Sequence, residues 1–354
     1  MKLIITIDTE GDDQWDPRLP RSTENIRFIP GFQDLCERYS FPPTYLCTYD
    51  VAAAPAFEDV LLPLHKSGRA EIGAHLHPWA TPPFSLWDRG ETGAAYPSEL
   101  PSGVFARKLE CLTVLLARKL GESPRSYRAG RWGLSAAHIP ILLQLGYIVD
   151  CSVTPLLSWG DPGARERGQD FSDAPVRPYF MAWGDPAREG ASGLLEVPVT
   201  IVCTNGLMRR SPLLRAAYRR YRKTSSARLL NRMFSIAPRW FRPFSDMSVA
   251  RLRAVYDTAR RLELPVVEMM FHSSELMPHG SPHNPTVESV ERLYERLEQI
   301  FAYLAQQRAE GVTLSAFAEP IRLQAVSSSR PPTLALSGDE LTWAPGHDAV
   351  MNHG

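Results

Sequence analysis

Short apolar segments alternate with longer amphipathic segments over most of the chain. Seven runs of aliphatic, β-branched or aromatic residues, bounded by Gly, Pro or polar residues, are typical of strands: 2–8, 44–49, 70–75, 126–129, 147–152, 194–199 and 266–271. Between them, helices are predicted within 31–39, 56–67, 103–120, 135–145, 248–263 and 286–309. This alternation predicts a parallel sheet, and about seven strands predict an α/β fold of the distorted (β/α) barrel type. An open doubly wound sheet is the alternative.

The predicted barrel occupies residues 1–321, and two segments depart from its pattern. Residues 207–243 hold eleven Lys or Arg and no acid, and apolar residues among them suggest an amphipathic helix: Leu213, Leu214, Ala217, Tyr218 and Tyr221. We therefore expect a basic helical insertion at about 204–246. It either meets an anionic substrate or membrane surface, or is a solvated insertion. Residues 322–354 lack a pattern and predict a loosely ordered C-terminal tail.

Composition and charge exclude several classes of protein. Hydrophobic residues make up 44% and charged residues 22%, as in ordinary globular proteins. Lys plus Arg and Asp plus Glu both number 39, so the overall charge does not favour nucleic acid as a partner. Five cysteines without a CxxC pair argue against a disulfide framework. The amino terminus has no signal-peptide layout, so we expect a cytoplasmic location.

Two predicted strands end in residues suited to metal binding. The first ends in Asp8-Thr9-Glu10-Gly11-Asp12-Asp13. Carboxylates this close together typically bind a cation, or one of them has a shifted pKa. The third ends in His75 and His77, which lie two apart on an extended segment and so point to the same side. We expect a divalent metal, zinc first, at His75, His77 and a carboxylate: Glu10, or Asp12 instead. Hydrogen-bonded loop histidines are the alternative.

Three further predicted strands also end in charged or titratable residues, namely Arg128, Asp150 and His272. The carboxyl ends of parallel strands meet at one edge, which is where α/β active sites lie. We therefore expect these residues in one site, where an arginine can orient a carboxylate. Trp79 and Trp132 follow two of these strands, and either stack on a sugar or serve as core aromatics. No Gly-x-Ser-x-Gly, P-loop or GxGxxG motif is present.

In this order, the motifs resemble those of the polysaccharide deacetylase superfamily (NodB-like, carbohydrate esterase family 4-type), over roughly residues 1–320. The segments that carry the resemblance are Asp8 with Glu10, 43–46, 71–75, 127–130, 145–152 and 271–272. The version without a leader resembles members found in surface-polysaccharide biosynthesis. Two features depart from the family: the second acid comes one residue later, and the histidines lie two apart rather than four.

The resemblance implies a metal-dependent hydrolase that removes an N-acyl (acetyl) group from an amino sugar or glycan intermediate. In that scheme Asp8 is the general base, Arg128 orients it and His272 is the general acid. Asp150 orients His272 or contacts substrate. Two alternatives stay open: another C–N hydrolase on the same fold, such as a deformylase or cyclic-amide hydrolase, and a non-catalytic carbohydrate-binding or assembly protein.

Overall fold

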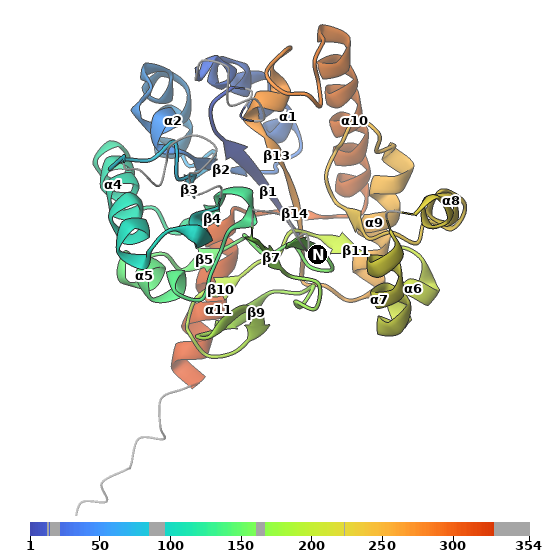
Figure 1. Cartoon of the computed structure of the whole chain (residues 1–354). Coiled ribbons are helices and arrows are strands. Elements are labelled where there is room, and N and C mark those ends of the chain that lie inside the picture. Colours follow the sequence, from blue (N-terminus) through green and yellow to red (C-terminus); the bar gives the residue numbers. More distant parts are fainter. Residues whose placement is uncertain (13, 15–21, 85–95, 161–166, 223, 329–354) are drawn as a thin grey trace, which may run out of the picture.

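The fold is built around one curled sheet (Figure 1). The computed structural model describes residues 1–12, 14, 22–84, 96–160, 167–222 and 224–328. Seven strands pair in parallel in the order β13-β1-β2-β3-β4-β5-β10. Their bounds are β1 Lys2–Thr9, β2 Pro43–Cys47, β3 Glu71–Leu76, β4 Ser126–Ala129, β5 Val149–Asp150, β10 Leu195–Glu196 and β13 Val266–His272. All seven predicted strands are present, and the distorted (β/α) barrel is confirmed.

The barrel is incomplete between β10 and β13. From β10 the sheet continues into antiparallel β8 (Tyr179–Ala182) and β9 (Asp185–Glu189), while β14 (Glu310–Gly311) pairs with β1. Thr200 bridges the gap. Its Oγ1 accepts a 2.8 Å hydrogen bond from the backbone N–H of Glu268, and its own N–H lies 3.4 Å from the Glu268 carbonyl oxygen. Two small two-stranded antiparallel sheets, β6–β7 and β11–β12, lie outside the main sheet; their strands are Ser158–Gly160, Arg167–Asp170, Ile201–Val202 and Arg239–Trp240.

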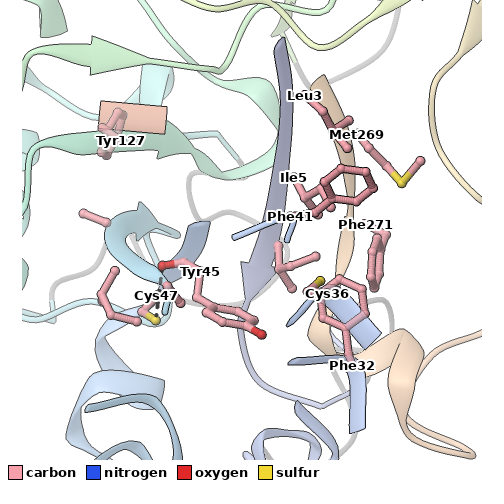
Figure 2. Packing of buried hydrophobic residues seen from close by; sticks show 14 of the residues in the cluster. Leu3, Ile5, Phe32, Cys36, Phe41, Tyr45, Cys47, Tyr127, Met269 and Phe271 are labelled. Atoms are coloured by element: carbon pink, nitrogen blue, oxygen red, sulfur yellow. Dashed lines mark hydrogen bonds between the residues drawn. The ribbon is translucent and has the colours of Figure 1, made fainter. Parts of the chain in front are cut away.

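Helices cover the outer face of the sheet. They are α1 (Ile29–Arg38), α2 (Tyr49–Ala53), α3 (Leu62–Lys66), α4 (Ser102–Leu120), α5 (His138–Gln144), α9 (Val249–Arg261) and α10 (Val287–Gln306). Successive strand residues face opposite sides of the sheet. Figure 2 shows Ile5 of β1 and Phe271 of β13 packed with Phe32 of α1, whose ring meets that of Phe271 edge-on at 5.1 Å.

The inner face changes from apolar to polar along the strands. Toward the amino ends of β1 and β13, Ile4 and Val266 pack with Leu314 and Ala318 of α11 (Leu314–Ser328), so α11 closes that end of the barrel. Further along, the inward side chains are polar, which creates a buried polar site near the carboxyl ends of the strands. Because α11 runs to Ser328, part of the predicted tail is helical. Residues 329–354 lie outside the described residues, and the predicted domain division stays a prediction.

The basic insertion forms three short helices on one side of the molecule, beside α9 (Figure 1). They are α6 (Gly206–Arg210), α7 (Pro212–Tyr221) and α8 (Ser225–Phe234). In the described part of the chain, no helix combines the length and the apolar character that crossing a bilayer requires.

Candidate active site

Three buried side chains converge just beyond the ends of β1 and β3. Potential ligand atoms of Glu10, His75 and His77 all lie within 4.8 Å of one another. Oε2 of Glu10 lies 2.8 Å from Nε2 of His77 and 3.6 Å from Nε2 of His75. β2 alone separates the two strands, and the alternation of side chains along them turns all three residues inward.

The surroundings of these groups fit a metal ion. Nδ1 of His75 lies 3.0 Å from the carbonyl oxygen of Arg128, so Nδ1–H donates to it and the Nε2 lone pair faces Glu10. Oε2 of Glu10 is buried, and the polar atoms beside it are the Nε2 atoms of His77 and His75, at 2.8 and 3.6 Å. Two imidazole nitrogens and one buried carboxylate are the donor set expected of a zinc-type site with an open position.

Both the choice of carboxylate and the approach of His77 follow from neighbouring residues. Asp12 accepts hydrogen bonds of 3.0 Å from the backbone N–H groups of Glu24 and Asn25, so it shapes a turn and lies outside the cluster. A Cβ added to Gly130 would lie 2.5 Å from Nδ1 of His77, so only glycine leaves room for that imidazole. Glu10 is therefore the carboxylate that the structure offers to a metal.

Arg128 holds Asp8 next to the cluster. Its guanidinium is fully buried and donates to Oδ1 of Asp8 at 2.6 Å and to the Thr6 hydroxyl at 2.8 Å. Burial raises the pKa of Asp8, but the charges of Arg128, His75 and His272 outweigh burial and hold the pKa below its usual range. Asp8 is thus ionised at neutral pH, with Oδ2 directed toward the histidines.

Glu268, on β13, is a second counter-ion to Arg128. It hydrogen-bonds to Arg128 and to the Thr6 hydroxyl, and its side chain is fully buried. Burial raises its pKa to about 7, although Arg128 acts in the opposite direction. Glu268 was not among the predicted site residues; its one signal in the sequence is that it is a single acid within the apolar run 266–271.

His272 is oriented by Glu275 and Arg242. Oε1 of Glu275 lies 3.0 Å from Nδ1 of His272 and 2.5 Å from a guanidinium nitrogen of Arg242. Burial raises the pKa of Glu275, but Arg242 and His272 more than offset it, and the pKa is lowered to about 2. A guanidinium nitrogen of Arg242 also lies 3.0 Å from Nδ1, but the ionised Glu275 favours the tautomer in which Nδ1–H donates to its carboxylate. Nε2 of His272 then faces Asp8 at 3.9 Å and Glu10 at 3.7 Å.

Asp150 lies elsewhere. Its carboxylate accepts hydrogen bonds from the backbone N–H of Ser152 at 2.8 Å and from the Ser152 hydroxyl at 2.9 Å, and it pairs with Glu196. Burial raises the pKa values of both Asp150 and Glu196. The structure therefore places Asp150 in a separate buried carboxyl pair, while Glu275 occupies the position beside His272.

The two predicted tryptophans flank the site. The Trp79 ring lies 4.3 Å from the His77 ring, and its Nε1–H donates to Gln14 at 3.0 Å. Trp132 lies 5.3 Å from the guanidinium carbon of Arg128, but it is 9% exposed and belongs to a hydrophobic cluster. It has a φ of 63° and follows Arg131 at 52°, a strained turn of the kind found beside functional sites.

Comparisons with known proteins place the fold. No protein-family model matches the chain, and no curated protein matches it in sequence. Among solved structures, a candidate polysaccharide deacetylase from Mycobacterium smegmatis superposes with a TM-score of 0.53 at 16% identity, over 96% of this chain and 94% of that one. The Puue allantoinase superposes with a TM-score of 0.52 at 14% identity, over 92% and 89% of the two chains. The chain therefore has the polysaccharide deacetylase fold that its ordered motifs predict.

Proposed function

We propose that the protein is a metal-dependent hydrolase that removes an N-acyl group, acetyl first, from an amino sugar or glycan intermediate. The observation that carries the proposal is the convergence of Glu10, His75 and His77 beside two further groups: Asp8 paired with Arg128, and His272 paired with Glu275. The neighbouring structure named for polysaccharide deacetylation supports a sugar as substrate. A role in surface-polysaccharide biosynthesis belongs to the same proposal.

Glu10, His75 and His77 would hold the divalent ion, with zinc as the first candidate because two of three donors are imidazoles. Such an ion, when bound, polarises an amide carbonyl and lowers the pKa of a water molecule. The buried position of the three ligands keeps the negative charge of Glu10 poorly screened by solvent, which strengthens binding of a cation.

Asp8 is positioned to act as the general base. Arg128 binds Oδ1 of Asp8 and leaves Oδ2, which lies 4.0 Å from Nε2 of His75, free to accept the proton of an attacking water. The depressed pKa keeps Asp8 ionised and ready to accept that proton. In this role Arg128 is a positioning residue, and Glu268 holds it from the other side.

His272 is positioned to act as the general acid. Its Nε2 faces the cluster, and Glu275 at Nδ1 stabilises the protonated imidazole that gives its proton to the departing nitrogen. We assign to Glu275 the orienting role first given to Asp150. Trp79 and Trp132 remain our candidates for stacking on a sugar ring.

The predicted cytoplasmic location is also part of this proposal. All five cysteines are free, as they would be kept in a reducing compartment. The contact of residues 207–243 with a membrane or an anionic substrate remains a prediction.

Release of acetate from N-acetylated amino-sugar oligomers tests the proposal. We expect metal-dependent turnover by the wild type and at least a hundredfold loss in Asp8→Asn. The allantoinase neighbour favours cyclic amides as the second candidate substrate class. Turnover of a cyclic amide without turnover of any acylated sugar would replace the sugar proposal. Absence of both activities in the metal-loaded protein would contradict a hydrolase role.

A further inference from the structure

Exposed apolar side chains are concentrated on the basic insertion. The described part of the chain exposes fifteen large hydrophobic residues, and eight lie within 207–234: Leu207, Leu213, Leu214, Tyr221, Leu229, Leu230, Met233 and Phe234. Leu213 is 82% exposed and Leu207 is 72% exposed. Apolar side chains gathered in this way mark an interaction site, whereas isolated ones do not.

On α8 these side chains form one face. Leu229, Leu230, Met233 and Phe234 fall within an arc of roughly 140° on a helix of 3.6 residues per turn. Ala227, the buried residue of this helix, lies only about 20° beyond Phe234, at the edge of the arc. The four apolar side chains are nevertheless 47% to 64% exposed, so the packed side of α8 lies beside the apolar arc and leaves it uncovered.

The neighbouring helix α7 has the same arrangement. Leu213, Leu214, Ala217 and Tyr221 lie within an arc of roughly 100°, and all are exposed. None of the residues of α7 is buried. By contrast, Arg215 turns inward and donates to the carbonyl oxygens of Met208 and Arg209, at 2.9 Å each. In both helices, the residues that contact the rest of the molecule include Arg215 and Ala227, whereas the large apolar side chains of the arcs are exposed to solvent.

The charge of the insertion has one sign. Residues 207–243 contain eleven Lys or Arg and no acid. Two of these arginines form ion pairs within the molecule: Arg219 lies 3.7 Å from Asp173, and Arg242 lies 2.5 Å from Glu275. Arg220, Arg222 and Arg232 are exposed and pair with no carboxylate among the residues that the structure describes. Exposed arginines therefore flank the apolar arcs.

We propose that α7 and α8 dock on the surface of an anionic phospholipid bilayer. In this geometry the apolar arcs enter the boundary between headgroups and acyl chains, and the flanking arginines meet the phosphates. Charge argues against a second copy of this chain as the occupant, since two such faces would repel each other. Nucleic acid fits less well, because binding to bases relies on stacking aromatics and most of the exposed apolar residues are aliphatic.

The end of the insertion connects this docking face to the active site. Trp240 of β12 lies 5.7 Å from Trp132, and Arg242, two residues later, contacts Glu275 beside His272. Docking would therefore hold one wall of the site near the bilayer, where a lipid-linked sugar is presented. This consequence for the substrate rests on the proposed function, whereas the docking itself does not.

Co-sedimentation with vesicles tests the proposal. The wild type should bind vesicles of phosphatidylglycerol mixed with phosphatidylcholine, should ignore phosphatidylcholine alone, and should lose binding as salt rises. A charge variant (Arg220→Gln, Arg222→Gln, Arg232→Gln) should bind about a hundredfold more weakly, from roughly a fivefold loss per arginine. An apolar variant (Leu229→Ser with Met233→Ser) should lose at least about tenfold.

A matched control also replaces two exposed apolar residues by serine, but outside the insertion. It is Val287→Ser with Leu323→Ser, at positions that are 53% and 64% exposed. This variant should bind as the wild type does. Failure of the wild type to bind anionic vesicles at low salt would overturn the proposal, as would equal binding of the charge, apolar and control variants. So would binding of duplex DNA without vesicle binding, or a dimer that only the apolar variant dissociates. Should a variant fold poorly by circular dichroism, the salt and lipid dependence of the wild type still decides.

Discussion

Gly130→Ala should displace His77 although it replaces none of the proposed metal ligands. The new Cβ would lie 2.5 Å from Nδ1 of His77 and 2.6 Å from the carbonyl oxygen of Leu76, whereas ordinary contacts are about 3.5 Å or longer. The Leu76 carbonyl belongs to β3, whose pairing with β4 resists movement, so the imidazole has to turn away. Overpacking of this size costs about 1–3 kcal/mol of stability. Loss of orientation of one ligand weakens metal binding about 10- to 100-fold.

Zinc affinity measured by competition with a chromophoric chelator, together with urea unfolding, provides the assay. Gly184→Ala is the matched control, since no atom lies within 4 Å of its added Cβ. We expect the control to keep the affinity and stability of the wild type. Wild-type zinc affinity in Gly130→Ala would refute the reasoning, because it would show either that His77 is not a ligand or that the crowded geometry does not exist.

Three further results follow from the contacts of individual side chains. Asp8→Asn should keep its bound metal but lower kcat by about 10²–10⁴, the usual contribution of a general base; a near-normal kcat would remove Asp8 from that role. Glu275→Gln should lower kcat by about tenfold or more, yet have no further effect in a His272→Ala background; an additive loss would show that Glu275 does not act through His272. His138, stacked on Phe105 at 3.6 Å, has its pKa lowered by burial from 6.5 to about 3. Because the pKa of His138 is lower in the folded than in the unfolded protein, neutral His138 contributes its full stabilisation above about pH 6.5. That contribution to the free energy of unfolding is lost as the pH falls toward 3, by up to about 5 kcal/mol. Relative to His138→Phe, the wild type should therefore lose free energy of unfolding over that range, and parallel curves for the two proteins would contradict this.

The positions of the strands could be predicted from the sequence because buried parallel strands are short apolar runs between loop residues. Helix ends were harder to place. Residues 56–67 were expected as one helix but form a π-helical turn, Phe57–Leu61, followed by α3, with Pro63 in the first turn of α3. Within the basic insertion, an amphipathic helix was expected around Leu213–Tyr221, and α7 (Pro212–Tyr221) forms there. The starts of α7 and α8 are set by Ser211 and Thr224, each of which accepts a hydrogen bond from a backbone N–H three residues later.

The site was predictable where it depends on strand ends. Asp8, His75, His77, Arg128 and His272 all terminate or closely follow parallel strands, and topology alone brings such residues together. Partners that depend on three-dimensional pairing were not predictable. The role of Glu268 becomes visible only through its contact with Arg128, which is 140 residues away in sequence. Asp150 follows a strand like the others, but its carboxylate turns to Ser152 and Glu196.

Elemental analysis of the purified protein tests the central claim most directly. The account predicts about one divalent ion, zinc first, per chain in the wild type, and its loss in the double variant His75→Ala with His77→Ala. Gly184→Ala serves as the control and should keep the ion. Equal metal content in the wild type and the double variant would contradict the assignment of Glu10, His75 and His77 as the metal centre. A wild type that binds no zinc, and gains no stability when zinc is added, would contradict it as well.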